Sequence, residues 1–100
     1  MKYNKLVRDK IPEIIKESGG TPITHIAADV EYWLKLKEKL LEEIKEFFEN
    51  ESIEELADVK EVLNAIRDYK GFSESELEAT RVAKAEKRGA FEKRIILEES

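Results

Sequence analysis

The apolar spacing of residues 29–50 is the feature that most constrains the fold of this chain. Large apolar side chains recur there every three or four residues, which is the period of an α-helix with one buried face. They form one stripe: Trp33, Leu36, Leu40, Ile44 and Phe47. Three more residues widen that stripe: Leu34, Leu41 and Phe48. One neighbouring helix cannot cover so wide an arc, so the pattern predicts a long helix with more than one packing partner.

Local start and stop signals predict three further helices. Pro12 suits the first turn of a short helix that ends at Gly19. Ser52 and Ser73 are each followed three residues later by Glu, a spacing that is typical of a capping box at a helix start. The two helices that begin there are expected to end before the glycines at 71 and 89. Asp29 is the expected cap of the long helix.

These elements predict an all-α fold with a central antiparallel helix hairpin, in which residues 29–50 pair with residues 52–70. One hundred residues fit a single domain, residues 1–100, with a small core. Residues 91–97 are expected to form an extended tail that packs on a neighbour. Together with the wide apolar arc, this organisation predicts a helical bundle assembled as a homo-oligomer, either a homodimer or a homotetramer.

The composition restricts both chemistry and location. The chain has no cysteine, so a metal ion would have to bind oxygen ligands or the single histidine. It has no apolar run of about 20 residues and no signal-type segment, which predicts a cytoplasmic protein without a membrane partner. The net charge of −5 argues against a nucleic-acid polymer as partner. Residues 42–61 are acidic while 2–16 and 81–94 are basic, which suits a divalent cation bound together with an anion.

Four carboxylates lie on the half-buried sides of the two hairpin helices. Glu43 and Glu46 are three residues apart, as are Glu55 and Asp58, so each pair shares one helix face. Both pairs are equally far from the turn near Asn50, which places them at matching heights across a gap of roughly 8–10 Å. Four acids in a partly apolar groove repel one another unless a cation is present. Oxygen-only ligands select a hard ion, here Mg²⁺ with Mn²⁺ as a substitute.

An alternative without a metal explains the same pattern. Acidic pairs at this spacing arise by chance in a helix rich in Glu and Lys, and Glu55 can simply complete the capping box of Ser52. Nearby lysines can also neutralise the acids: Lys35, Lys37, Lys39, Lys45 and Lys60. The spacing alone leaves both interpretations open.

The two acidic motifs resemble the signature of the MazG-like all-α nucleoside triphosphate pyrophosphatases. That signature is E-E-x-x-E followed by E-x-x-D, here residues 42–46 and 55–58. The ends of the chain, YNKLVRDKIPEII from Tyr3 and KAEKRGAFEKRI from Lys84, are similar to the small branch termed phosphoribosyl-ATP pyrophosphohydrolase-like. The similarity covers nearly the whole chain. The chain differs from the family pattern in two respects. Only eight residues separate the motifs, which implies a tight hairpin. Ala90 stands where a second glycine is common.

The resemblance implies Mg²⁺-dependent hydrolysis of a nucleoside triphosphate to the monophosphate and pyrophosphate, as in nucleotide-pool house-cleaning. It carries Glu43, Glu46, Glu55 and Asp58 over as metal ligands. Glu42, the first Glu of the motif, is expected to point away from the groove and is left out of this set. Glu46 is the preferred candidate to accept the proton of the attacking water.

Candidate substrate-binding residues follow from charge and side-chain chemistry. Five basic residues near the chain ends are candidates for the phosphate tail: Arg8, Lys10, Lys84, Lys87 and Arg88. Their alternative is a surface role as exposed charges paired with nearby glutamates. Trp33 is a candidate for stacking on a base, although a Trp on a helix stripe more often belongs to the core. Asn64 lies off the apolar arc and is a candidate for a base edge.

Two other functions compete with this one. A phosphoribosyl-ATP pyrophosphohydrolase would cleave the same bond in a different substrate. A non-catalytic helical module would instead dimerise or bind a protein partner. Release of pyrophosphate from a panel of nucleotides distinguishes these three functions.

Overall fold

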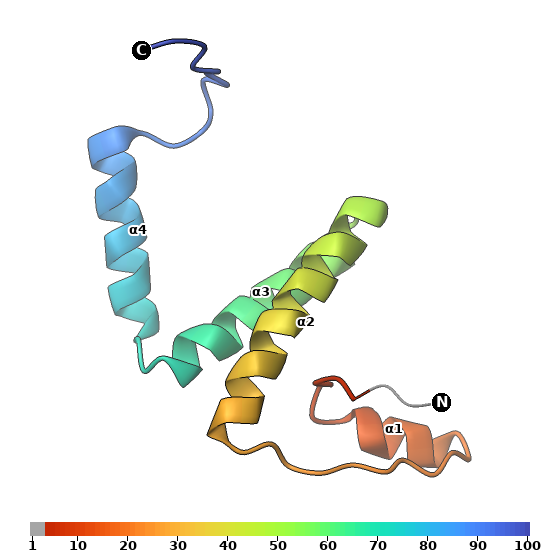
Figure 1. Ribbon diagram of the computed structural model, residues 1–100. Coiled ribbons are helices and arrows are strands. Elements are labelled where there is room, and N and C mark those ends of the chain that lie inside the picture. Colours follow the sequence, from red (N-terminus) through yellow and green to blue (C-terminus); the bar gives the residue numbers. More distant parts are fainter. Residues whose placement is uncertain (1–3) are drawn as a thin grey trace.

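The computed structural model describes residues 4–100, which form an all-α chain with four helices (Figure 1). The helices are α1 (Ile11–Glu17), α2 (Asp29–Glu49), α3 (Ile53–Tyr69) and α4 (Glu74–Arg88). Tyr3, which opens the amino-terminal motif, lies outside the described residues, as does the first part of the basic segment 2–16. A membrane-spanning helix is absent from residues 4–100, because even the 21-residue α2 is too polar for one.

α2 and α3 form the predicted antiparallel hairpin, and theirs is the only extensive helix–helix contact within residues 4–100 (Figure 1). The core lies in this contact. Leu36 of α2 and Val62 of α3 are the buried apolar side chains of the described part of the chain. The other members of the predicted α2 stripe are half-buried: Trp33, Leu40, Ile44 and Phe47. The apolar stripe is therefore the face that packs within one chain.

The starts of α3 and α4 follow the sequence signals. The Oγ atoms of Ser52 and Ser73 each accept a hydrogen bond from the backbone N–H three residues on, at 3.3 and 3.0 Å. The expected cap of α2 is wrong by one residue. Asp29 is the first residue of the helix, and the extended Ala28 precedes it without a side-chain cap. Asp29 instead places a negative charge in the first turn, where the helix dipole favours it.

Two leucines of α3 are less buried than their apolar character predicts. Leu56 and Leu63 are 52% and 47% exposed. The face of α3 that meets α2 runs through Val59, Val62 and Ile66. Leu56 and Leu63 lie about 100° around the helix from Val62, so α2 does not reach them.

The chain as a whole leaves a large surface uncovered. Its accessible surface is 9275 Å², against roughly 5800 Å² for a compact monomer of this mass. Its radius of gyration is 17.8 Å, against about 13 Å for a compact chain of 100 residues. The residues that widen the α2 stripe are half or more exposed: Leu34, Leu41 and Phe48. One chain therefore covers only one face of its hairpin.

α4 and the tail project away from the hairpin (Figure 1). No residue of α4 is buried. The apolar side chains of the tail are almost fully exposed: Phe91, Ile95, Ile96 and Leu97. The packing of this tail on a neighbour stays a prediction.

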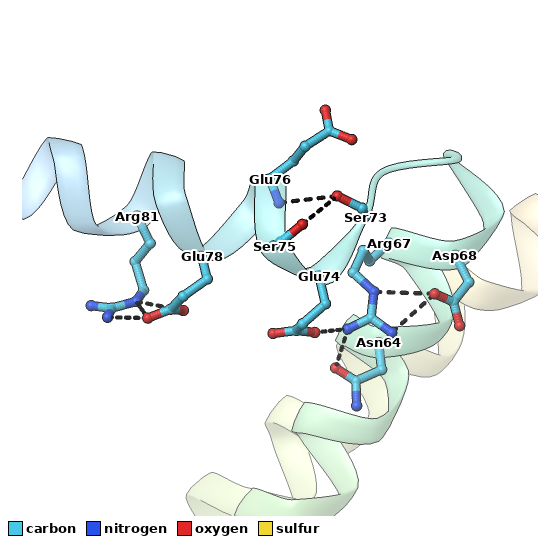
Figure 2. A network of polar contacts seen from close by, with 9 residues as sticks. All are labelled: Asn64, Arg67, Asp68, Ser73, Glu74, Ser75, Glu76, Glu78 and Arg81. Atoms are coloured by element: carbon cyan, nitrogen blue, oxygen red, sulfur yellow. Dashed lines mark hydrogen bonds and ion pairs between the residues drawn. The ribbon is translucent and has the colours of Figure 1, made fainter.

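A polar joint connects α3 to α4 (Figure 2). The Arg67 guanidinium is only 15% exposed and donates to Asn64 Oδ1 at 3.2 Å and Asp68 Oδ1 at 2.9 Å. It also pairs with Glu74 in the first turn of α4. The direction in which α4 leaves the hairpin is thus held by polar contacts rather than by apolar packing.

Candidate metal centre

Three carboxylates from the two hairpin helices meet in one cluster. Glu43 of α2 and Glu55 and Asp58 of α3 each offer an oxygen, and these oxygens all lie within 4.8 Å of one another. Glu43 is 6% exposed, and Glu55 and Asp58 are half-buried. The structure thus brings three of the four predicted ligands together. Their role as ligands stays a prediction.

Two oxygens of this cluster have no partner among the described residues. Glu43 Oε2 and Glu55 Oε2 are buried and accept no hydrogen bond. The backbone N–H of Ser52 donates to Asn50 O at 2.7 Å, so the Glu55 carboxylate does not complete a capping box. Burying a carboxylate oxygen without a partner is costly. The unpartnered oxygens therefore favour the interpretation in which a cation belongs at this point.

Two cations of the protein lie beside the cluster. Lys39 Nζ is 3.1 Å from Glu43 Oε1, one helical turn away on α2. Arg8 Nη2 is 2.7 Å from Asp58 Oδ1 and comes from the segment before α1. Each cation binds one oxygen of its carboxylate, while the unpartnered oxygens belong to Glu43 and Glu55. Lys39 is one of the five lysines that the alternative without a metal invokes, and it neutralises the acids only in part.

Glu46 lies at the edge of the cluster and is not one of its three members. Its pKa is raised, chiefly because a hydrogen bond to Glu43 favours the protonated form. Partial burial and the negative charges of Glu43, Glu42 and Glu55 raise it further. The group is therefore a stronger base than an ordinary glutamate.

Glu42 lies outside the three-member cluster and outside the cavity lining. Its side chain is half-buried and bonds Lys5 Nζ at 3.0 Å and Lys39 Nζ at 3.5 Å. Burial pushes the pKa of Glu42 upward, but the hydrogen bonds and charges of Lys5 and Lys39 outweigh it and hold that pKa below its usual value. The same hydrogen bond raises the pKa of Lys5. Glu42 thus anchors the amino-terminal segment to α2.

A cavity of about 480 Å³ opens beside the cluster. Glu43 and Asp58 line it together with residues 6–10, and three of the predicted substrate-binding residues lie on its wall: Arg8, Lys10 and Asn64. Its volume falls in the range of small-molecule sites. The structure therefore joins two of the three acids of the cluster and these polar side chains in one space.

The remaining predicted substrate-binding residues lie elsewhere. Trp33 is outside the cavity lining and stacks on Tyr69, with ring centroids 5.2 Å apart and planes at 4°. The three cations of α4 are exposed and line an open depression on that helix alone: Lys84, Lys87 and Arg88. Because α4 projects away from the hairpin, one chain does not bring them to the cluster (Figure 1). The Asn64 amide oxygen accepts from Arg67, as Figure 2 shows.

Sequence reasoning missed several residues of the cavity wall. Tyr32, Glu61 and Asp68 line it. Glu61 and Asp68 follow Asp58 at helical spacing on the same face of α3, so extending the pattern past the motif would have found them. The pairs of Lys5 with Glu42 and of Arg8 with Asp58 are 37 and 50 residues apart, and no local pattern signals them.

The donor set fits a hard divalent ion. Oxygens around an octahedral Mg²⁺ are separated by roughly 3 Å when adjacent and about 4 Å when opposite. The three carboxylate oxygens are within 4.8 Å of one another, so small side-chain rotations suffice to close on an ion. The unpartnered oxygens Glu43 Oε2 and Glu55 Oε2 belong to two of these three residues.

Comparison with known proteins adds one relative. A curated protein of Mycolicibacterium smegmatis, described as an uncharacterized protein, is 52% identical over 42 residues. These residues span 42% of this chain and 43% of that protein. No protein-family model matches the chain, and no solved structure matches it. The resemblance of the acidic motifs to MazG-like enzymes therefore stays a prediction.

Proposed function

We propose that this protein is a Mg²⁺-dependent nucleoside triphosphate pyrophosphohydrolase of the MazG-like kind, acting in nucleotide-pool house-cleaning. One observation carries the proposal. The carboxylate of Glu43 is more than nine-tenths buried, has an oxygen without a partner, and faces Glu55 and Asp58 from the opposite helix. Lys39 and Arg8 each pair with one oxygen of the cluster, and a bound cation would compensate the buried oxygens of Glu43 and Glu55 that remain without a partner.

Glu43, Glu55 and Asp58 would hold the ion, with Glu46 beside them. Bound Mg²⁺ supplies charge neutralisation on the phosphate oxygens and makes a nearby water more acidic. Water attacks the α-phosphorus, and the bond from that phosphorus to the bridging oxygen breaks, so that pyrophosphate leaves. Glu46, which lies beside Glu43, would accept the proton of the water.

The cavity supports a nucleotide as the ligand. Arg8 and Lys10 line it near the acid cluster, where cations are suited to the phosphate tail. Asn64 on α3 lines the same cavity and offers an amide to a base edge. Trp33 is a weaker candidate for base stacking, because Tyr69 already covers one face of its ring.

The working form is proposed to be a homodimer or a homotetramer built as a helical bundle. The accessible surface exceeds that of a compact monomer by an amount on the order of 3000 Å². A stable interface needs about 800 Å² from each partner. The uncovered flank of the hairpin, which carries Leu34, Leu41 and Phe48, offers apolar area for a second copy.

Incubation with a panel of nucleotides and Mg²⁺, followed by separate detection of pyrophosphate and orthophosphate, tests the proposed reaction. The expected result is pyrophosphate release that is lost in Glu55→Gln and kept in Glu54→Gln, which removes the same charge from an exposed position of α3. Release of orthophosphate without pyrophosphate would reject the proposed bond. Turnover confined to phosphoribosyl-ATP would identify the alternative enzyme.

Two negative results together have a distinct meaning. No nucleotide is hydrolysed, and Mg²⁺ does not change the thermal stability of the protein with or without a nucleotide analogue. These results would reject the metal site. The unpartnered apolar surface would then point to a non-catalytic helical interaction module.

A further inference from the structure

The Arg8 guanidinium occupies the acid cluster from outside the hairpin. Its Nη2 is 2.7 Å from Asp58 Oδ1, across 50 residues of sequence. Lys39 is the other cation of the cluster and has a different character. Its side chain is 16% exposed and belongs to α2 itself, whereas the Arg8 side chain is 54% exposed. Lys39 is therefore a fixed part of the hairpin, and Arg8 is the cation that can exchange partners.

The segment that carries Arg8 is held against the hairpin at a second point. Lys5 bonds Glu42 at 3.0 Å. Residues 6–10 form part of the cavity wall, and the carbonyl oxygen of Arg8 accepts from the N–H of Ile11 at the entry to α1. The half-buried Leu6 and Val7 keep the Arg8 backbone beside the cavity, while the exposed ion pair of Arg8 with Asp58 is weak and easily exchanged.

We infer that Arg8 makes this site select a divalent cation that arrives with a phosphate-bearing ligand over the bare cation. A bare cation enters beside the guanidinium and competes with it for Asp58, so the positive charge of Arg8 opposes binding. A cation accompanied by pyrophosphate brings net negative charge into the cavity that Arg8 lines. The guanidinium then leaves Asp58 and donates to phosphate oxygens, a geometry that suits its planar fork.

This inference rests on the proposed function, because it assumes the cation site at Glu43, Glu55 and Asp58. It goes further by giving Arg8 opposite effects on two ligands. Removing a group that only orients Asp58 would weaken the binding of both ligands. Charge selection instead predicts that removing Arg8 strengthens the binding of the bare cation and weakens the binding of the phosphate-bearing ligand.

Titrations with Mn²⁺ and inorganic pyrophosphate test this signature in the full chain. Free Mn²⁺ is measured by electron paramagnetic resonance, and pyrophosphate binding at saturating Mn²⁺ by calorimetry. Arg8→Gln is expected to bind Mn²⁺ alone roughly threefold to tenfold more tightly and to bind pyrophosphate roughly threefold to tenfold more weakly. Both effects should shrink as salt is added.

Two further variants sharpen the comparison. Arg81→Gln removes the same charge from a guanidinium that pairs with Glu78 on α4, and it should change neither titration. Arg8→Lys keeps the positive charge but loses the two-pronged donor. It is expected to bind Mn²⁺ alone like the wild type and to bind pyrophosphate more weakly than the wild type.

The outcomes separate this inference from the function on which it rests. If Arg8→Gln weakens or leaves unchanged the binding of Mn²⁺ alone, charge selection is wrong while the cation site survives. If the wild type binds Mn²⁺ neither alone nor with pyrophosphate, and Glu55→Gln behaves identically, both the inference and the proposed cation site fall.

Discussion

Trp33 and Tyr69 stack with their ring centroids 5.2 Å apart and their planes at 4°, which joins the first turns of α2 to the last residue of α3. Tyr32 packs edge-on against the same Tyr69 ring at 5.5 Å. This contact closes the end of the hairpin that lies opposite the connecting turn. The acid cluster is therefore built on helices that are fastened at both ends.

Tyr69→Ala is expected to lower the free energy of unfolding by about 2 kcal/mol, because it removes the ring stacking and the apolar area that the ring covers. Tyr69→Phe keeps the rings and loses only the hydrogen bond from Tyr69 Oη to Asp29 O, which is 3.3 Å long. Its cost should stay below about 1 kcal/mol. Urea unfolding followed by the fluorescence of Trp33, the single tryptophan, measures both at fixed protein concentration. Equal costs for the two variants would contradict the stacking role.

Glu55→Gln is expected to reduce turnover at least about 100-fold, since a ligand of the catalytic ion would be lost. The same variant should leave the free energy of unfolding unchanged or raise it by up to about 1 kcal/mol, because it relieves repulsion among the carboxylates. Steady-state kinetics and urea unfolding provide the two measurements, with Glu54→Gln as the matched control. A variant that unfolds in buffer would show that Glu55 acts in stability instead.

Mg²⁺ is expected to stabilise the wild type against heat, by about 1.4 to 2.7 kcal/mol when its concentration is 10 to 100 times the dissociation constant. Thermal melts with increasing Mg²⁺, and their reversal by a chelator, measure this effect. Glu43→Gln should abolish it, because Glu43 supplies the most buried oxygen of the cluster. An equal shift in that variant would place the ion somewhere else.

Glu46→Gln is expected to lower kcat by roughly 10²- to 10⁴-fold, the usual contribution of a general base. Since Glu46 lies at the edge of the three-oxygen cluster, binding of Mn²⁺ alone should change far less than in Glu55→Gln. Kinetics paired with the Mn²⁺ titration separate the two roles. Equal losses of kcat and of Mn²⁺ affinity would instead identify Glu46 as a metal ligand.

Leu41→Glu combined with Phe48→Glu is expected to reduce the assembly to monomers or to unfold the chain, because both side chains are about 70% exposed in one chain. Light scattering during size-exclusion chromatography, together with circular dichroism, gives the mass and the helix content. Lys45→Glu adds acid at an exposed position of the same helix and serves as the control. An assembly that keeps its mass in the double variant would move the interface to another face.

The sequence predicts what local rules control. Ser52 and Ser73 cap their helices because the bond from each hydroxyl spans only three residues. Glu43, Glu55 and Asp58 meet because a short turn fixes the register of the hairpin. Glu46 falls outside the group although Glu55 and Asp58, with the same spacing of three residues, both belong to it, so the spacing alone does not decide which acids meet.

What the sequence does not predict depends on distant contacts. The pairing of Arg8 with Asp58 and of Lys5 with Glu42 requires the amino-terminal segment to return to the hairpin, and no periodicity encodes that return. The exposure of Leu56 and Leu63 depends on which flank of α3 faces α2. Hydrophobicity alone ranks both leucines with the buried Val62.

The separation of α4 from the hairpin has a consequence for how the protein melts. Leu36 and Val62 are the only buried apolar side chains in the part of the chain that the structure describes, and α4 contributes none. If the chain assembles as proposed, association would bury apolar side chains that one chain leaves exposed and would add to its resistance to heat. The melting temperature of such an assembly would fall as the protein is diluted.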